Sequence, residues 1–220
     1  MFVININGTH SFRQTIFTIS RDAVIYLGSL FKKYNVSKTA KKNEIAYNRK
    51  FVFDCFRMIM RYDTLGGDSL QWAHSDINNL IDAKTETTTL ELFASPINNV
   101  SDIYCSLFLD TDKPFGSAGS FPNNIPSIKD GFTVLCNPPY IEKILNDAAM
   151  LCLKLLNEYQ IQVAFTCPKW IDMPAYIEMS KSKYLVKSSN PIGMRSALTR
   201  MEITQGMHKS TVFHLSSKKE

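Results

Sequence analysis

The strongest constraint on the fold is a strand, a turn, a helix and a second strand that follow one another between residues 132 and 165. Phe132 to Cys136 form an apolar, β-prone run, bounded by Asp130-Gly131 before it and by two prolines after it. Apolar residues then recur at helical spacing, at Ile141, Ile144, Leu145, Ala148, Cys152, Leu155 and Leu156. Ile161 to Phe165 supply the next apolar run. This order predicts an α/β fold, in which ligands bind at the carboxyl ends of the strands.

Asn137-Pro138-Pro139-Tyr140 lies at such a strand end, and its chemistry suits an exocyclic amino group. An aromatic amine is a weak nucleophile because its lone pair is delocalised into the ring. The Asn137 side-chain oxygen and the Pro138 carbonyl can accept its two N–H groups, and these bonds strengthen as positive charge develops on nitrogen. Tyr140 offers a ring on which an extruded base stacks. We therefore predict that Asn137, Pro138, Pro139 and Tyr140 are catalytic. The alternative is a rigid turn with proline at the first helical position.

Length and composition restrict the class of protein. With 220 residues and a mass of 25.0 kDa, the chain suits one domain with a small appended subdomain. Apolar runs are far shorter than a membrane span, and the first residues lack the basic start of a secretory signal. We expect an intracellular protein without membrane association, and the sequence does not distinguish nucleus from cytoplasm. The five cysteines are an odd number without a C-x-x-C pair, so we expect reduced thiols and no metal site.

The first third of the chain has the pattern of a mainly helical subdomain. Residues 2–20 alternate around Asn7-Gly8-Thr9, which indicates a hairpin. Arg21 to Tyr34 and Asn48 to Tyr62 each carry an apolar stripe at helical spacing, and Trp72 to Ala83 suggest a third, shorter helix. We therefore expect a helical subdomain in residues 1–84 and an α/β domain in residues 85–220.

A second strand-and-loop unit precedes the first in the sequence. Leu90 to Phe93 form an apolar run that leads into Ala94-Ser95-Pro96-Ile97-Asn98, where small residues permit close backbone approach to a cofactor. Val100, Ile103, Tyr104, Leu107 and Phe108 then recur at a spacing that predicts a helix. Asp110 to Ser117 follow with two carboxylates, which could hold ribose hydroxyls or an ammonium group. The alternative is a surface turn whose aspartates cap backbone N–H groups.

Positive charge is concentrated in two segments. Seven Lys and Arg residues lie between Lys32 and Lys50 against the single acid Glu44, and a second basic region extends from Lys181 to Arg200. Such segments contact phosphates, although lysine-rich loops also serve only to keep a protein soluble. The residues that we predict to contact the phosphates of a nucleic acid are Lys32, Lys33, Lys41, Lys42, Arg195 and Arg200.

Several blocks in one order carry a family resemblance. Glu91 to Asn98, Asp110 to Ser117 and Asn137 to Tyr140 resemble the catalytic domain of the phosphorylated-CTD-interacting-factor family. The likeness extends upstream to Phe53 to Leu65, and downstream to Pro168-Lys169-Trp170 and Met207 to Val212. Nearly the whole chain is therefore covered.

This resemblance implies a Rossmann-like class I methyltransferase with a small N-terminal helical subdomain that helps to hold capped RNA. Members of the family use S-adenosylmethionine to methylate the 6-amino group of the 2′-O-methyladenosine next to the mRNA cap. On this basis we expect cofactor contacts from Phe93, Ala94, Ser95, Pro96, Asn98, Asp110, Asp112, Phe115, Gly116, Ser117 and Asn137.

Two departures from the family pattern leave alternatives open. The family usually has phenylalanine where this chain has Tyr140, and its WW module has no counterpart in these 220 residues. The Asn-Pro-Pro-Tyr motif alone does not specify the polymer, so an adenine methyltransferase acting on DNA or internal RNA is an alternative. A catalytically inactive RNA-binding partner subunit is another.

Overall fold

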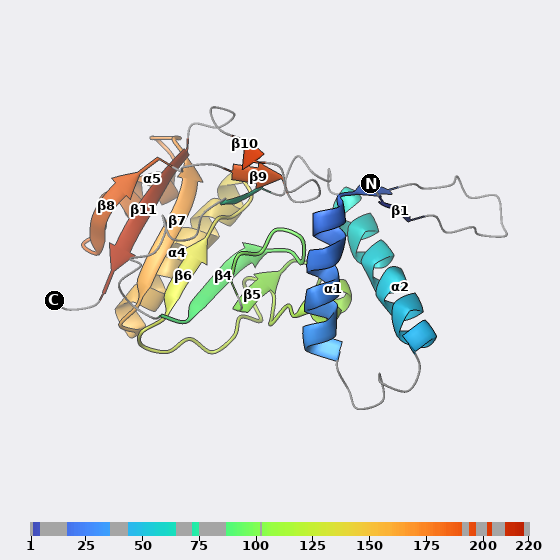
Figure 1. The fold of residues 1–220 in the computed structure, drawn as a ribbon. Coiled ribbons are helices and arrows are strands. Elements are labelled where there is room, and N and C mark those ends of the chain that lie inside the picture. The colour runs from blue at the N-terminus through green and yellow to red at the C-terminus, as the bar shows by residue number, and fades with distance from the viewer. Residues whose placement is uncertain are drawn as a thin grey trace.

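The computed structural model describes residues 2–4, 17–35, 44–64, 72–74, 87–101, 103–190, 194–196, 202–203 and 210–217. Its largest sheet has six strands in the order β5-β4-β6-β7-β11-β8 (Figure 1). The bounds are β4 Thr89–Ala94, β5 Ile103–Ser106, β6 Thr133–Cys136, β7 Gln162–Pro168, β8 Leu185–Ser189 and β11 Ser210–Ser216. Strands β5, β4, β6 and β7 are parallel, whereas β11 is antiparallel to both of its neighbours. The predicted mixed α/β fold is confirmed, and it is compatible with a Rossmann-like architecture.

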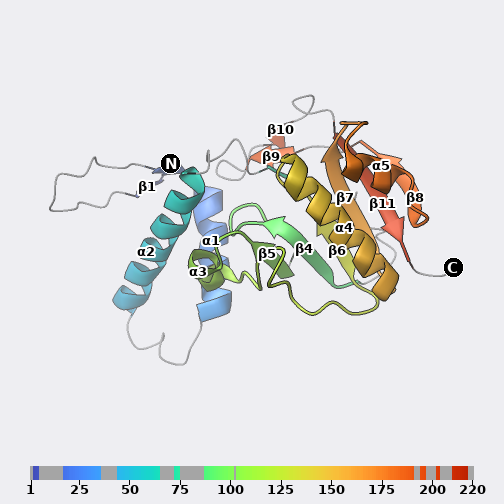
Figure 2. The ribbon, with the colours of Figure 1, turned by 180° about the vertical axis from the view of Figure 1, so that it is seen from behind.

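Helices α4 (Glu142–Glu158) and α5 (Pro174–Ser180) cover one face of this sheet, as Figure 2 shows. Helix α4 buries Leu145, Cys152 and Leu156 against strand residues such as Val134 and Phe165, which together form the main core. The apolar spacing after Tyr140 therefore predicted this helix correctly, and the flanking runs became β6 and β7.

The segment after β4 corrects one prediction. Residues 103–106 form strand β5, which pairs in parallel with β4, and the chain then continues into the short α3 (Leu109–Asp112) and the 3-10 turn η4 (Lys113–Phe115). The helical spacing failed because the side chains of Asn98 and Asn99 bond to Ser95 and so hold a tight turn instead of a helix start. Strand β3 (Trp72–His74) similarly replaces the start of the helix that was expected there, and the rest of that segment lies outside the described residues.

The N-terminal part contains two long helices, α1 (Arg21–Asn35) and α2 (Glu44–Asp63), beside the β5 edge of the sheet (Figures 1 and 2). Ser20 Oγ accepts a hydrogen bond of 3.1 Å from the Ala23 backbone N–H, so it caps the first turn of α1. Strands β1 (Phe2–Ile4) and β2 (Phe17–Ile19) pair antiparallel, as the expected hairpin requires, and its turn lies outside the described residues.

The two helices form a second apolar core, which residues of the α/β part complete. Their buried side chains, among them Leu27, Phe31 and Met58, pack against Ile97 and Phe115 from the α/β part. Helices α1 and α2 therefore share one apolar core with two loops that leave the carboxyl ends of β4 and β5, and the division into two domains at residue 84 stays a prediction.

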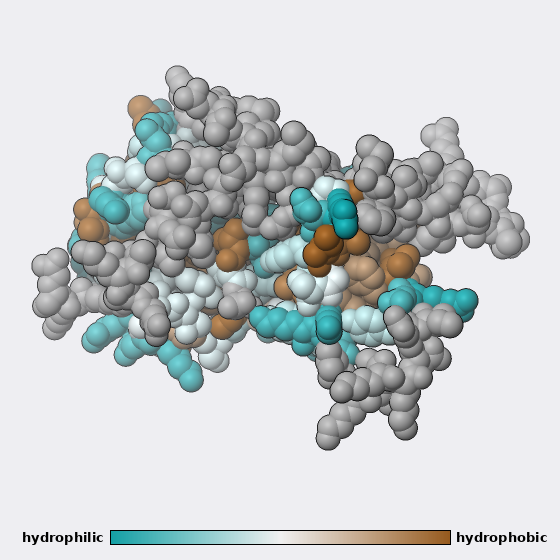
Figure 3. All heavy atoms as spheres, viewed as in Figure 1, coloured by the Kyte–Doolittle hydropathy of each residue, from teal (hydrophilic) through white to brown (hydrophobic). Residues whose placement is uncertain are grey.

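Two further features complete the fold. A small sheet has the order β10-β9-β3, where β9 is Met194–Ser196 and β10 is Glu202–Ile203. Exposed large apolar side chains of α1 and α2 include Ile25, Val52, Phe53 and Met60, and Figure 3 shows apolar atoms over this pair of helices. No helix in the described ranges is long and apolar enough to cross a membrane.

Candidate active site

The carboxyl ends of four parallel strands meet at one edge of the sheet. They end at Ser106 in β5, Ala94 in β4, Cys136 in β6 and Pro168 in β7. The predicted catalytic loop, residues 137–140, therefore leaves the sheet next to the loop that begins at Ser95. The structure brings together the two loops that the sequence assigned to the same site.

Asn137 follows β6 and lies beside a buried carboxylate that we did not predict. A small cavity is lined by Glu91, Val100, Leu135, Cys136, Asn137, Ala164 and Thr166. Glu91 is only 6% exposed although it lies in the middle of β4, and one of its oxygens accepts a 2.9 Å hydrogen bond from the Val100 backbone N–H. A charged residue inside the apolar run Leu90 to Phe93 was the available signal, because a buried carboxylate needs a partner.

Loop 95–100 is held from within by asparagine side chains. Asn98 Oδ1 accepts hydrogen bonds from the Ser95 backbone N–H at 2.6 Å and from Ser95 Oγ at 3.0 Å. Asn99 Nδ2 donates to the carbonyls of Ser95 and Pro96, and its Oδ1 accepts a 2.7 Å bond from the Tyr26 hydroxyl of α1. These hydrogen bonds fix the conformation of the loop without a ligand, and helix α1 contributes one of them through Tyr26.

Tyr140 is positioned by contacts with the start of β11 and with the turn after β7. Its hydroxyl shares a 2.7 Å hydrogen bond with Ser210 Oγ at the start of β11, and its ring lies 6.4 Å from the Trp170 ring at an interplanar angle of 68°. Burial raises the pKa of Tyr140, an effect that the bond to Ser210 opposes. The phenol is therefore protonated at neutral pH, and it has no role as a base in this arrangement.

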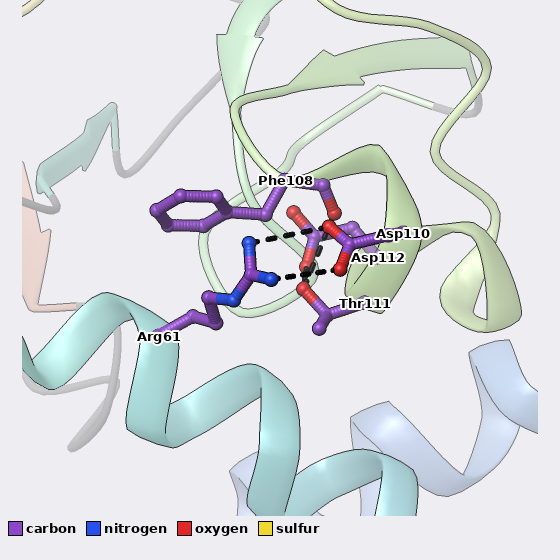
Figure 4. Close-up of polar contacts among 5 residues, drawn as sticks. All are labelled: Arg61, Phe108, Asp110, Thr111 and Asp112. Atoms are coloured by element: carbon purple, nitrogen blue, oxygen red, sulfur yellow. Dashed lines mark hydrogen bonds and ion pairs between the residues drawn. The ribbon is translucent and has the colours of Figure 1, made fainter.

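The loop with the two carboxylates faces helix α2 (Figure 4). Arg61 forms a 2.9 Å ion pair with Asp110 and lies over the Phe108 ring, 5.0 Å from its centroid. The Tyr62 hydroxyl donates a 2.5 Å hydrogen bond to Asp112, whose other carboxylate oxygen accepts a bond from Thr111 Oγ1. Two adjacent residues of α2 therefore bond to the two carboxylates of this loop.

Asp112 is fully buried, and Asp110 is not. The side chain of Asp110 is 54% exposed, whereas Asp112 is 0% exposed. Burial raises the pKa of the Asp112 carboxyl to about 6, and hydrogen bonds from Tyr62, Ser106 and Thr111 oppose this rise. Of the two predicted carboxylates, Asp110 is the one that solvent reaches.

Helix α1 packs on the remainder of the same loop. The Phe31 and Phe115 rings lie 5.7 Å apart, and Asn35 Nδ2 donates a hydrogen bond to the Pro114 carbonyl. Gly116 has φ of 100°, and a Cβ placed there would come within 2.1 Å of the Tyr34 ring. Glycine is thus required both for the backbone conformation and for close approach of Tyr34. Ser117 accepts a 2.7 Å bond from Ser106 Oγ, which ties the loop back to β5.

The predicted RNA contacts are only partly described. Lys32 and Lys33 are exposed in the last turn of α1, and Lys33 Nζ lies 5.2 Å from the centroid of the Tyr34 ring. Arg195 belongs to β9, where its backbone pairs with Ala73 of β3. Lys41, Lys42 and Arg200 lie outside the described residues. Whether these cations form one groove stays a prediction.

Comparisons with known proteins indicate the family to which the chain belongs. A family model described as "Phosphorylated CTD interacting factor 1 WW domain" matches residues 27–200, which include the last part of α1, all of α2, β4 to β8 and the Asn137 loop. A mouse protein named "mRNA (2'-O-methyladenosine-N(6)-)-methyltransferase" is 33% identical over 100 residues, and a human protein of the same name is 32% identical. Each alignment covers 44% of this chain and 14% of the relative, so the matched segment spans about a seventh of each relative's length.

Proposed function

Because the chain belongs to the phosphorylated CTD interacting factor 1 family, we propose that it is an S-adenosylmethionine-dependent methyltransferase acting on the 6-amino group of adenosine in RNA. The most specific substrate that we propose is the 2′-O-methyladenosine next to the mRNA cap, which is the nucleoside in the names of its mouse and human relatives. Support for a class I Rossmann-like fold comes from the mainly parallel sheet in which one strand, β11, is antiparallel.

One observation carries the proposal. Asn137 stands at the carboxyl end of β6, next to the carboxyl end of β4, from which loop 95–98 leaves the sheet. An amide oxygen at that edge, followed by the Pro138 carbonyl, offers two acceptors to one amino group. We propose that the strand end holds both acceptors in place before substrate arrives, which is the condition for stabilising charge that develops in the transition state.

The residues at this edge fit the proposed cofactor. We propose that the ligand lies against the backbone at Ala94 and Ser95, whose small side chains are both buried, and that Asp110, which pairs with Arg61, offers a solvent-accessible carboxylate for hydroxyl or ammonium groups. Phe93, Pro96, Asn98 and Asn137 would complete the contacts. We propose that Asp112, Phe115, Gly116 and Ser117 support the site indirectly, because they hold the loop that presents Asp110. Bound S-adenosylmethionine would supply an electrophilic methyl group on sulfur.

Tyr140 would hold the target base through its ring. The hydrogen bond to Ser210 and the neutral phenol leave the ring as its contribution, because a stacking contact needs only the π-face. The amine loses its proton after attack, so no strong base is required at this position.

The test is methyl transfer to three matched oligonucleotides at one salt concentration, with the product position read by mass spectrometry. The first is capped RNA that begins with 2′-O-methyladenosine, the second is the same RNA without a cap, and the third is DNA of the same sequence. We expect the capped RNA to be methylated fastest, because a held cap would fix the first nucleotide near Asn137. Equal rates on all three would contradict cap specificity and leave an adenine methyltransferase of DNA or internal RNA.

The other alternative, an inactive RNA-binding subunit, makes a different prediction. Such a protein would bind the oligonucleotides and would show no transfer to any of them. RNA binding can be measured separately from methyl transfer through its dependence on salt. Phosphate contacts by the basic segments weaken as salt is added, whether or not transfer occurs.

A further inference from the structure

Trp170 stands beside the proposed base site without an assigned role. It lies in the turn after β7 and is 46% exposed, which is unusual for so large an aromatic residue. Its position is fixed by the backbone, because its N–H donates to the Pro168 carbonyl at 2.7 Å and its carbonyl accepts from the Met173 N–H at 2.9 Å. Pro168 and Met173 are both buried. The ring is therefore presented to solvent by a turn that is anchored at both ends.

The angle between the two aromatic rings decides what Trp170 can bind. A base that stacks on Tyr140 is parallel to the Tyr140 ring, and the Trp170 plane is inclined to that ring by 68°. One flat base cannot stack on both rings at once. A second base can stack on Trp170 only if it is splayed away from the first.

The surroundings of Trp170 suit a nucleotide. Lys169 is exposed next to it and carries a positive charge that a phosphate would pair with. The centroid separation of 6.4 Å between the rings is short enough for neighbouring nucleotides of one strand to reach both. Aromatic rings beside a basic residue are the usual platform for single-stranded bases.

Building on the proposed function, we propose that Trp170 is the stacking site for a second nucleobase, the neighbour of the target adenosine in the same strand. The target adenosine and its neighbour are then unstacked from each other, and the substrate enters the site as a single strand. The neighbour is either the cap guanine on the 5′ side or the next base on the 3′ side. Both present the same flat aromatic surface to the indole.

The proposal is tested by binding, with no need for methyl transfer. In a Trp72→Phe background Trp170 is the sole tryptophan, since the chain has only two. Titration with capped RNA should quench its fluorescence, because a stacked base contacts the indole face. An uncapped RNA with an abasic site on the 3′ side of the target adenosine lacks both neighbouring bases and should bind with little quenching. Equal quenching by the two RNAs would overturn the proposal.

Affinity gives a second readout with matched variants. Trp170→Ala should weaken binding of capped RNA by roughly 5- to 150-fold, whereas Trp170→Phe should weaken it far less. Ile171→Ala is the control, because Ile171 is the adjacent apolar residue and is 66% exposed. The effect of Trp170→Ala should disappear on RNA that lacks the neighbouring base. A loss that is the same on all RNAs would show a merely structural role.

Two changes to the RNA, each made alone, show whether the neighbouring base lies on the 5′ or the 3′ side of the target adenosine. If removing the cap abolishes the effect of Trp170→Ala, the partner is the cap guanine, and if a 3′ abasic site abolishes it, the partner is the following base. Either result supports the proposal, and retention of the effect on both RNAs contradicts it. A wild-type protein that binds RNA with this coupling but transfers no methyl group would refute the proposed function and leave the stacking site intact.

Discussion

The loop after β6 and the loop after β5 leave the same edge of the sheet, but they face different neighbours. The β6 loop places Asn137 and Tyr140 beside strands β4, β7 and β11. The β5 loop, residues 107–117, is bonded to the helices, with Asp110 on Arg61 and Asp112 on Tyr62. Both loops carry polar residues of the kind found in active sites. The two loops differ in which part of the molecule supplies the partners of these side chains.

This difference assigns separate tasks to the two loops. In our account the β6 loop performs the chemistry, and the β5 loop couples the helical subdomain to the edge where the cofactor would lie. Replacements in the β6 loop should change the rate of methyl transfer without changing the free energy of unfolding. Replacements in the β5 loop should mainly change the free energy of unfolding.

The largest effect is expected at Asn137. Asn137→Ala should lower the rate of methyl transfer by roughly 100- to 1000-fold, because one preorganised acceptor is removed. The midpoint of chemical unfolding should change little. Steady-state kinetics and denaturation of the same preparation measure both, and Asn123→Ala, at an exposed turn position, is the control. A wild-type rate in Asn137→Ala would refute the assigned role.

Gly116→Ala should have the largest effect on stability in the β5 loop. We expect a loss of about 2–4 kcal/mol, because alanine is strained at a φ of 100° and its Cβ would meet the Tyr34 ring. Gly131 is a matched control, since its φ is 88° and a Cβ there would meet nothing within 4 Å. Urea unfolding of the two variants separates backbone strain from the contact. Equal losses at both positions would show that the Tyr34 contact has no importance.

Asp112 should make stability depend on pH. Its folded pKa of about 6 lies above the ordinary value of 3.8, so the folded state holds the proton more tightly than the unfolded state. The free energy of unfolding should therefore fall as pH rises from about 4 to above 6, by at most about 3 kcal/mol. Comparing unfolding at several pH values for wild type and Asp112→Asn isolates this contribution. A wild-type slope that Asp112→Asn leaves unchanged would assign it to another group.

The smallest effect is expected at Arg61. Arg61 and Asp110 are both about half exposed, so their ion pair should contribute only about 0.2–1 kcal/mol and should weaken as salt is added. A double-mutant cycle with Arg61→Gln and Asp110→Asn measures the coupling. A coupling above about 2 kcal/mol would mean that the pair is more important to the interface than its exposure implies.

Much of this architecture could be predicted from short-range patterns. The apolar runs before and after Asn137 became β6, α4 and β7 because their spacing fits one buried face. The structure of the segment after Ser95 could not be predicted from its apolar spacing. Asn98 and Asn99 bond to the Ser95 backbone, and the following residues then pair with β4 as the parallel strand β5. Whether a local spacing becomes helix or strand depends there on a distant partner.

The candidate site shows the same limit. Asn137 was predictable because its position relative to a strand end is a local property. Partners such as Tyr62 for Asp112, Ser210 for Tyr140 and Val100 for Glu91 come from packing between elements, and no spacing in the sequence encodes them.

Calorimetric titration of S-adenosylmethionine tests the central claim most directly, namely that the ends of β4 and β6 form one cofactor and amino-group site. We expect one bound cofactor per chain, affinity weakened about tenfold in Asn98→Ala, which removes the acceptor of both Ser95 bonds, and a smaller loss in Asn137→Ala, which removes one contact. No binding to the wild-type chain, or equal affinity in wild type and Asn98→Ala, would contradict the claim.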